Sequence, residues 1–114
     1  MNYERLDVWR KSVALTTEIY SLMKDNRDFG FKDQICRSSV SVPSNIAEGC
    51  ERLSRKEKAH FLAIAKGSLG ELKTQVIIAN NIGYIAPEPA MKLKHECDTI
   101  GRMLGALIKR TQGT

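Results

Sequence analysis

Hydrophobic residues recur along this chain at intervals of three and four, which is the spacing of one face of an α-helix. Four segments show this pattern, and polar or glycine-containing breaks separate them. The pattern predicts helices over about residues 5–24, 31–51, 55–82 and 88–110, within a single domain spanning residues 1–114. No stretch sustains strict apolar–polar alternation, so we expect no sheet. Four helices with short connections predict an all-α, antiparallel up-down four-helix bundle.

Each predicted helix has its own expected core stripe. In chain order the stripes are Leu6, Trp9, Val13, Thr16, Tyr20 and Met23, widened by Leu15 and Ile19; then Phe31, Ile35, Ser39, Val42 and Ile46; then Leu62, Ala65, Leu69, Leu72, Val76 and Ala79; and finally Leu93, Cys97, Ile100, Leu104 and Leu107. The aromatic residues Trp9, Tyr20 and Phe61 are therefore expected to be packing residues and not a platform for stacking bases.

Local signals mark the helix ends and one irregularity. Pro43 falls inside the second helix, and because proline lacks an N–H and clashes with the preceding turn, we expect a kink near it. Ser54 followed by Glu57 is a capping box at the start of the third helix. Gly83 suits a left-handed cap at the end of that helix, and Pro87 is tolerated in the first turn of the fourth.

Composition narrows the class of protein. The chain has 114 residues, of which 42% are hydrophobic and 27% charged, as in one globular domain. No apolar run approaches the roughly 20 residues that a membrane span needs, and no apolar signal core follows the N-terminus, so we expect a cytoplasmic protein. The three cysteines, Cys36, Cys50 and Cys97, are too few and too widely spaced for a disulfide framework, which favours buried free thiols.

Positive charge is concentrated in the second half of the chain. Residues 1–51 carry seven bases and eight acids, whereas residues 52–114 carry eleven bases and five acids. The densest basic patch comprises Arg52, Arg55, Lys56 and Lys58, followed by Lys66 and Lys73. A basic half suggests a polyanion or an acidic protein as partner. Taken alone, the charge favours the simpler explanation of a solvated helix face.

No catalytic or metal-binding constellation stands out. The two histidines, His60 and His95, share no helical metal-ligand spacing. The serines near Pro43 have neither a local base nor a nucleophile elbow. The run Lys66-Gly67-Ser68 lacks the upstream glycine and the strand of a phosphate-binding loop. We therefore expect no enzyme, no metal and no cofactor.

Two sets of residues are expected to be structural instead. Four polar residues beside the apolar stripes should form a structural polar network, bonded to one another or to the backbone near the expected kink: Asn45, Glu48, Glu71 and Gln75. Gly67 and Gly70 lie mid-helix, where each glycine costs about 1 kcal/mol relative to alanine, so a packing or interface reason is expected. Self-association is predicted from these small residues and from apolar residues outside the main stripes, namely Val8, Ile64, Ile77 and Ile78.

Three stretches of the sequence together resemble one protein family. They are Leu6–Lys11, Ser41–Gly49 with its run VPSNIAEG, and Phe61–Gln75 with its run GSLGELKTQ. In this order and spacing they resemble the 23S rRNA intervening-sequence proteins, a family that includes the accessory variability determinant of diversity-generating retroelements. The resemblance covers nearly the whole chain, from about residue 3 to residue 109.

The resemblance implies an elongated four-helix protomer that assembles into a ring-like homopentamer, without enzymatic activity. For the retroelement members it implies binding to a reverse transcriptase and, through a basic surface, to nucleic acid. Two positions depart from the family pattern: Cys36 precedes Arg37 where two adjacent arginines are common, and Glu51 replaces the usual glycine before an arginine. Both departures reduce positive charge near the second helix.

The charge asymmetry and the resemblance together predict a non-catalytic oligomeric scaffold that binds RNA or RNA/DNA, with a reverse transcriptase as a candidate partner. The candidate phosphate contacts, which would bind the backbone without reading sequence, are Arg37, Arg52, Arg55, Lys56, Lys58, Lys66 and Lys73. The alternative is a protein-interaction module with no nucleic-acid role, which the departures at Cys36 and Glu51 favour. A small-molecule or metal site in the bundle core is a third, weaker alternative.

Overall fold

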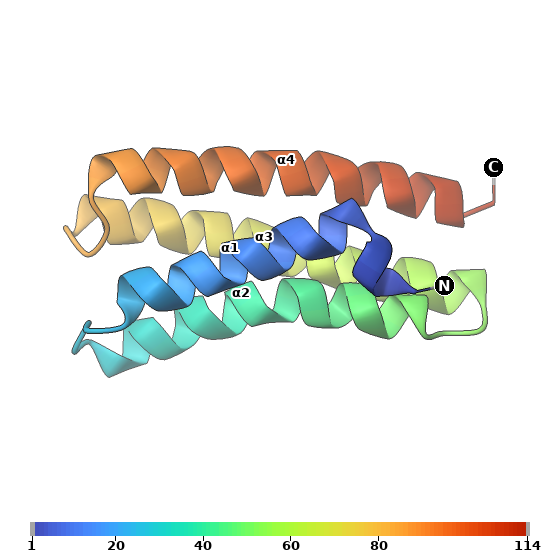
Figure 1. Ribbon diagram of the computed structural model, residues 1–114, viewed down its shortest axis with the longest axis horizontal. Helices are drawn as coiled ribbons and strands as arrows, with labels where there is room; N and C mark the ends of the chain where they lie inside the picture. The colour runs from blue at the N-terminus through green and yellow to red at the C-terminus, as the bar shows by residue number, and fades with distance from the viewer. Residues whose placement is uncertain (1, 114) are drawn as a thin grey trace.

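The computed structural model describes residues 2–113, and these form four α-helices and one short 3-10 helix with no strand. The elements are η1 (Tyr3–Arg5), α1 (Asp7–Met23), α2 (Phe29–Cys50), α3 (Arg55–Asn81) and α4 (Pro87–Thr111). The four helices confirm the predicted all-α class. In Figure 1 the chain reverses direction at each connection between helices, so the helices lie side by side in a bundle measuring 44 × 22 × 20 Å.

Side-chain caps fix where two of the helices begin. Asp28 Oδ1 accepts a hydrogen bond from the Phe31 N–H at 3.2 Å, so α2 begins at Phe29, earlier than expected. Ser54 Oγ accepts from the Glu57 N–H at 3.0 Å, as the capping box predicts. Glu57 Oε1 accepts from the Ser54 hydroxyl at 3.2 Å and not from the Ser54 N–H. The loop after α3 turns at Gly83, which has the expected positive φ of 82°.

The apolar stripes of α2, α3 and α4 are buried as predicted, with Phe31 half-buried at the edge. The stripe of α1 differs: its buried residues are Val8, Ser12, Leu15, Ile19 and Met23. Tyr20, expected in the core, is 47% exposed, and Val8, expected on an outer surface, is buried. The reason is that α1 carries two overlapping apolar rows, and burying Leu15 and Ile19 turns Tyr20 toward solvent.

Helix α2 continues across Pro43 without a break, and the kink expected there stays a prediction. Because Pro43 has no N–H, the carbonyl of Ser39 loses its usual helical donor. Thr16 of α1 provides a replacement: its hydroxyl lies 2.8 Å from Ser39 O and 2.9 Å from Ser12 O. Pro43 and Ser39 are both buried, so this hydroxyl joins α1 to α2 at the point where the backbone of α2 lacks a bond.

We expect Thr16→Val to lower the free energy of unfolding by about 1–2 kcal/mol, because the buried Ser39 carbonyl then has no donor. Urea denaturation followed by circular dichroism at one protein concentration measures this loss. Thr17→Val is the matched control, since the exposed Thr17 hydroxyl bonds only the Val13 carbonyl of its own helix, at 2.9 Å.

A double-mutant cycle isolates the cause. In a Pro43→Ala background, the restored N–H at position 43 supplies the Ser39 carbonyl, so Thr16→Val should cost less than it does in the wild type. Equal costs in the two backgrounds would contradict the role assigned to Thr16.

Candidate nucleic-acid interface

A groove runs along the outer surface of the bundle between α3 and α4. Its two cavities, of about 520 and 730 Å³, follow one another along the same pair of helices. Small residues from both helices line it: Ala59, Ala63, Gly70, Gly101, Gly105 and Ala106. Because these side chains are short, the space between the two helices stays open to solvent.

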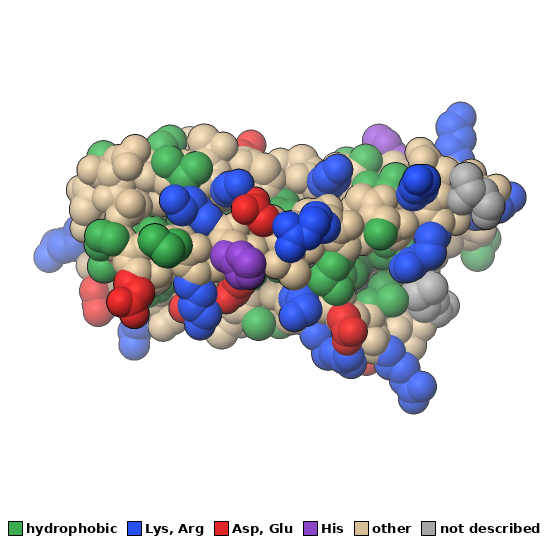
Figure 2. All heavy atoms as spheres, turned by 90° about the horizontal axis from the view of Figure 1, so that it is seen from above, with side chains coloured by type: hydrophobic (Ala, Val, Ile, Leu, Met, Phe, Trp, Pro, Cys, Tyr) green, Lys and Arg blue, Asp and Glu red, His purple; other side chains and the backbone are tan. Residues whose placement is uncertain are grey.

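Basic side chains are also prominent on the α4 side of the molecule. Figure 2 views the bundle from the α4 side and shows Lys and Arg side chains spread along the length of the face, with fewer acidic side chains among them. This distribution agrees with the excess of bases in residues 52–114. A surface of one charge sign attracts ligands of the opposite sign.

Four of the seven predicted phosphate contacts line the groove: Arg55, Lys56, Lys66 and Lys73. The position of Lys66 is the most informative. A Cβ added to Gly105 of α4 would stand 3.6 Å from Lys66 Nζ, so this ammonium extends from α3 across the groove floor. Neither Lys66 nor Arg55 nor Lys56 forms an ion pair with any residue from 2 to 113.

The opposite wall contributes a cation that the sequence analysis missed. Arg102 of α4 lines the groove, and its Nη2 lies 3.4 Å from Thr99 Oγ1. A signal for it was present, because Gly101 and Gly105 lie four residues apart and place Arg102 beside an open strip of α4. Apart from Arg37 of the second helix, the predicted phosphate contacts were all basic residues along α3 or just before it.

One ion pair crosses the groove and involves one of the predicted contacts. Lys73 Nζ of α3 lies 2.6 Å from Asp98 Oδ1 of α4. The hydrogen bond from Lys73 lowers the pKa of Asp98, so this carboxylate stays charged at neutral pH. Lys73 and Asp98 therefore neutralise each other, and the groove has no net positive charge at this position.

The other three predicted contacts lie elsewhere. Arg37 is exposed on α2, where its Nε lies 2.8 Å from Asp33 Oδ2. Lys58 is half-buried and its charge acts on the Cys50 thiol of α2, on the side of α3 away from the groove. The structure thus divides the seven predicted phosphate contacts among the α3–α4 groove, the surface of α2 and the α2–α3 connection.

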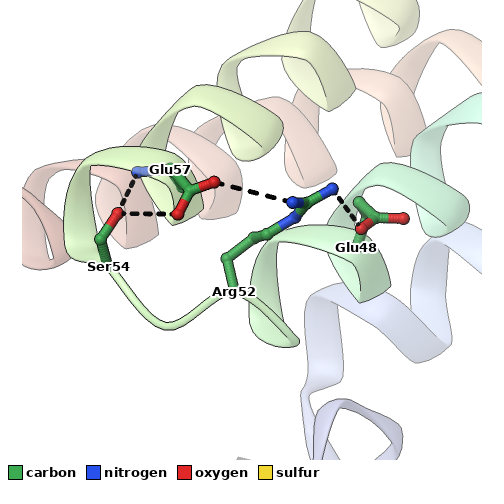
Figure 3. A network of polar contacts seen from close by, with 4 residues as sticks. All are labelled: Glu48, Arg52, Ser54 and Glu57. Carbon is green, nitrogen blue, oxygen red and sulfur yellow. Dashed lines mark hydrogen bonds and ion pairs between the residues drawn. The ribbon is translucent and has the colours of Figure 1, made fainter.

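Arg52 joins the end of α2 to the start of α3 (Figure 3). Its Nη2 lies 2.7 Å from Glu48 Oε2, and its Nη1 lies 3.6 Å from Glu57 Oε2. The guanidinium carbon also stands 4.6 Å from the centroid of the Phe61 ring, a cation–π distance. These contacts give Arg52 a structural role and leave fewer of its donors for a phosphate.

The polar residues expected to form one network are divided between two places. Asn45 Nδ2 donates to Ser41 O at 2.8 Å and to Ser41 Oγ at 2.9 Å, and Ser41 Oγ lies 2.8 Å from Ser68 Oγ of α3. The Ser38 hydroxyl donates to Glu71 Oε1 at 2.8 Å. Asn45 and Glu71 therefore connect α2 to α3 through serines and not through each other.

Glu48 and Gln75 take no part in that α2–α3 set. Glu48 pairs with Arg52, and Gln75 Oε1 is buried without a hydrogen-bond partner among residues 2–113. The sequence correctly indicated polar residues beside the core. It did not indicate that hydroxyls on the facing helix would be their partners.

Gly67 and Gly70 have no packing role within the chain. A Cβ added to either residue would meet nothing within 4 Å. By contrast, a Cβ on Gly101 would stand 3.5 Å from Leu69 Cδ2 across the helix interface. The reason expected for the two α3 glycines must therefore lie in the open groove or outside the protomer.

Cys97 lies on the groove floor, but its chemistry is limited. Burial raises its pKa to about 12, so at neutral pH the thiol is protonated and is not a nucleophile. Among residues 2–113, no group of three or more His, Cys, Asp or Glu is placed to hold a metal ion. The groove does expose positive charge, which binds anions.

No helix in the described part of the chain combines the length and the apolar character needed to cross a bilayer.

Comparisons with known proteins agree with the resemblance noted in the sequence. The family model described as 23S rRNA-intervening sequence protein matches residues 4–106. The chain is also similar to a crystal structure of a protein of unknown function from the S23 ribosomal protein family of Bacteroides thetaiotaomicron. The two share 25% identity with a TM-score of 0.84 over 90% of this chain and 98% of the other. No curated protein matches the sequence.

We expect Arg52→Gln to lower the free energy of unfolding by about 1 kcal/mol, because two partly exposed ion pairs and the ring contact are lost. Arg37→Gln is the matched control, since it removes one exposed pair within a single helix and should cost less than about 0.5 kcal/mol. Urea denaturation of both variants at one protein concentration gives the comparison. Equal losses would show that Arg52 does not stabilise the α2–α3 connection.

Proposed function

Since this chain belongs to the family of 23S rRNA-intervening sequence proteins, we propose that it is a non-catalytic scaffold that binds RNA through the α3–α4 groove. The observation that carries the proposal is the Lys66 ammonium, which lies over the groove floor without an ion-pair partner among the described residues. Arg55 and Lys56 continue the line of positive charge along the same groove. The family's name associates its members with a ribosomal RNA insert, and RNA is a polyanion.

The groove is suited to the backbone of a nucleic acid and not to its bases. Lysine and arginine bind phosphates through charge and release condensed counterions, which contributes affinity without sequence preference. Bases are held by stacking on exposed aromatic rings, and among the residues that line the groove the one such ring is the imidazole of His60. RNA binding at this site is therefore expected to be sensitive to salt and tolerant of sequence.

We also propose that copies of the chain associate through the outer face of α3. Ile78, which is 42% exposed, shares the middle of this face with Gly67, and Ile64 and Ile77, 38% and 39% exposed, flank it on the α2 and α4 sides. Exposed apolar residues around a glycine allow close approach of another helix. From the resemblance, the expected assembly is a ring of five subunits.

We expect a labelled RNA oligonucleotide to bind with an affinity that falls steeply as salt rises. A log–log slope of about −2 to −3 corresponds to three or four phosphate contacts on a single strand. Lys66→Gln should weaken binding and reduce the magnitude of the slope by about 0.7, the value for one phosphate contact. The control Arg37→Gln should change neither the affinity nor the slope. Fluorescence anisotropy across a salt series measures both quantities, and an affinity unchanged between low and moderate salt would contradict the proposal.

We expect light scattering to show an assembly larger than the 12.8 kDa protomer at micromolar concentration. Ile78→Glu should reduce that mass, because it places a charge on the proposed contact face. Met91→Glu, at an apolar residue of α4 that is 68% exposed, is the matched control and should leave the mass unchanged. A wild-type monomer would contradict self-association, and an assembly that binds no RNA would favour a protein-interaction module.

A further inference from the structure

We infer that the α3–α4 groove accepts one polynucleotide strand lengthwise and discriminates against a double helix. This inference rests on the RNA-binding function proposed above and specifies the form of nucleic acid that the groove takes. Packed helices lie about 8–10 Å apart, so the space between α3 and α4 is a narrow channel. A double helix is about as wide as the bundle, whose shorter dimensions are 22 and 20 Å, and would touch only the rims of the channel.

The position of Lys66 inside the channel is the reason that a single strand should bind better than a duplex. Its ammonium stands over the floor at Gly105, between the two helices and not out on a rim. A phosphate must enter the channel to reach this charge without moving it. The flexible backbone of a single strand can do so, whereas the phosphates of a duplex are held on a rigid cylinder.

The charges along the channel also determine how much of its length the strand occupies. Lys56 and Lys66 are ten residues apart on α3, which places them about 15 Å apart along the helix axis. Beyond Lys66, the Lys73–Asp98 ion pair crosses the channel and presents a carboxylate to an approaching phosphate. A strand is therefore bound between the Arg55 end of α3 and this ion pair, over a short footprint.

The open glycine on the channel floor fits the same account. A Cβ on Gly70 would meet nothing within 4 Å, although a glycine within a helix costs about 1 kcal/mol relative to alanine. Packing inside the protomer therefore does not explain it. A floor kept free of side chains does, because the strand occupies that volume.

The test fills the channel without altering its charge. Gly70→Leu and Gly105→Leu each place an uncharged side chain on the floor, from opposite walls. The Cβ on Gly70 meets nothing within 4 Å, whereas the Cβ on Gly105 contacts the Lys66 ammonium at 3.6 Å, so Gly70→Leu is the variant that tests filling alone. We expect each variant to bind a single-stranded RNA about tenfold more weakly while its affinity for the matching duplex stays unchanged. Gly30→Leu is the control, because a Cβ on this exposed glycine of α2 would meet only Asp28 Oδ1, at 3.9 Å.

The outcomes separate this inference from the function on which it rests. Fluorescence anisotropy at one salt concentration compares the strand and the duplex for the wild type, the two channel variants and the control, after urea denaturation has shown that each is folded. A wild type that binds neither form overturns the proposed function. A wild type that binds the duplex as tightly as the strand, or channel variants that bind the strand like the wild type, overturns the single-strand inference alone.

Discussion

The apolar row of α3 from Leu62 to Ala79 is enclosed because α2 packs against one side of it and α4 against the other. Helix α1 lies across the core from α3 and makes no close backbone contact with it. Burial of this one row fixes the rotation of α3 about its axis and so decides where each of its polar residues points. Lys66 and Gly70 then face the α4 side, Ser68 and Gln75 face α2, and Ile64 and Ile78 remain on the surface.

The two sides of α3 are built from different chemistry. On the α2 side, serine hydroxyls pair with one another and with Asn45 and Glu71, so the polar groups there are largely satisfied within the protein. On the α4 side, small residues leave a channel, and the Lys66 ammonium has no acidic partner among residues 2–113. A charge without an internal partner keeps its full attraction for an external anion, whereas Lys73 loses most of it to Asp98.

The sequence predicted correctly those features that depend on a single helix. It did not predict features that depend on how two helices pack. The rows of α2, α3 and α4 each contain a single continuous apolar stripe, so periodicity placed these stripes correctly in the core, although it missed neighbouring buried residues such as Cys36 and Ala59. Helix α1 has two overlapping rows, and the choice between them depends on its neighbours; Tyr20 was misplaced for this reason. The Ser54 cap and the positive φ of Gly83 are local and were predicted.

The candidate site shows the same limit. Charge along the sequence indicated a basic surface but not that Lys73 would be neutralised, because Asp98 reaches it only in the folded bundle. The Glu48–Arg52 pair, in contrast, has i,i+4 spacing and is visible in the sequence.

A site with few phosphate contacts would hold RNA weakly on its own. Each surface contact contributes modest free energy, and water and salt screen it. The outer face of α3 offers an answer, because it carries exposed isoleucines beside the groove and leaves the groove itself open. If copies associate through that face, each adds one channel, and one RNA that reaches several channels binds far more tightly than a single channel allows. Self-association and RNA binding would then use adjacent faces of α3, and the affinity for RNA would depend on self-association.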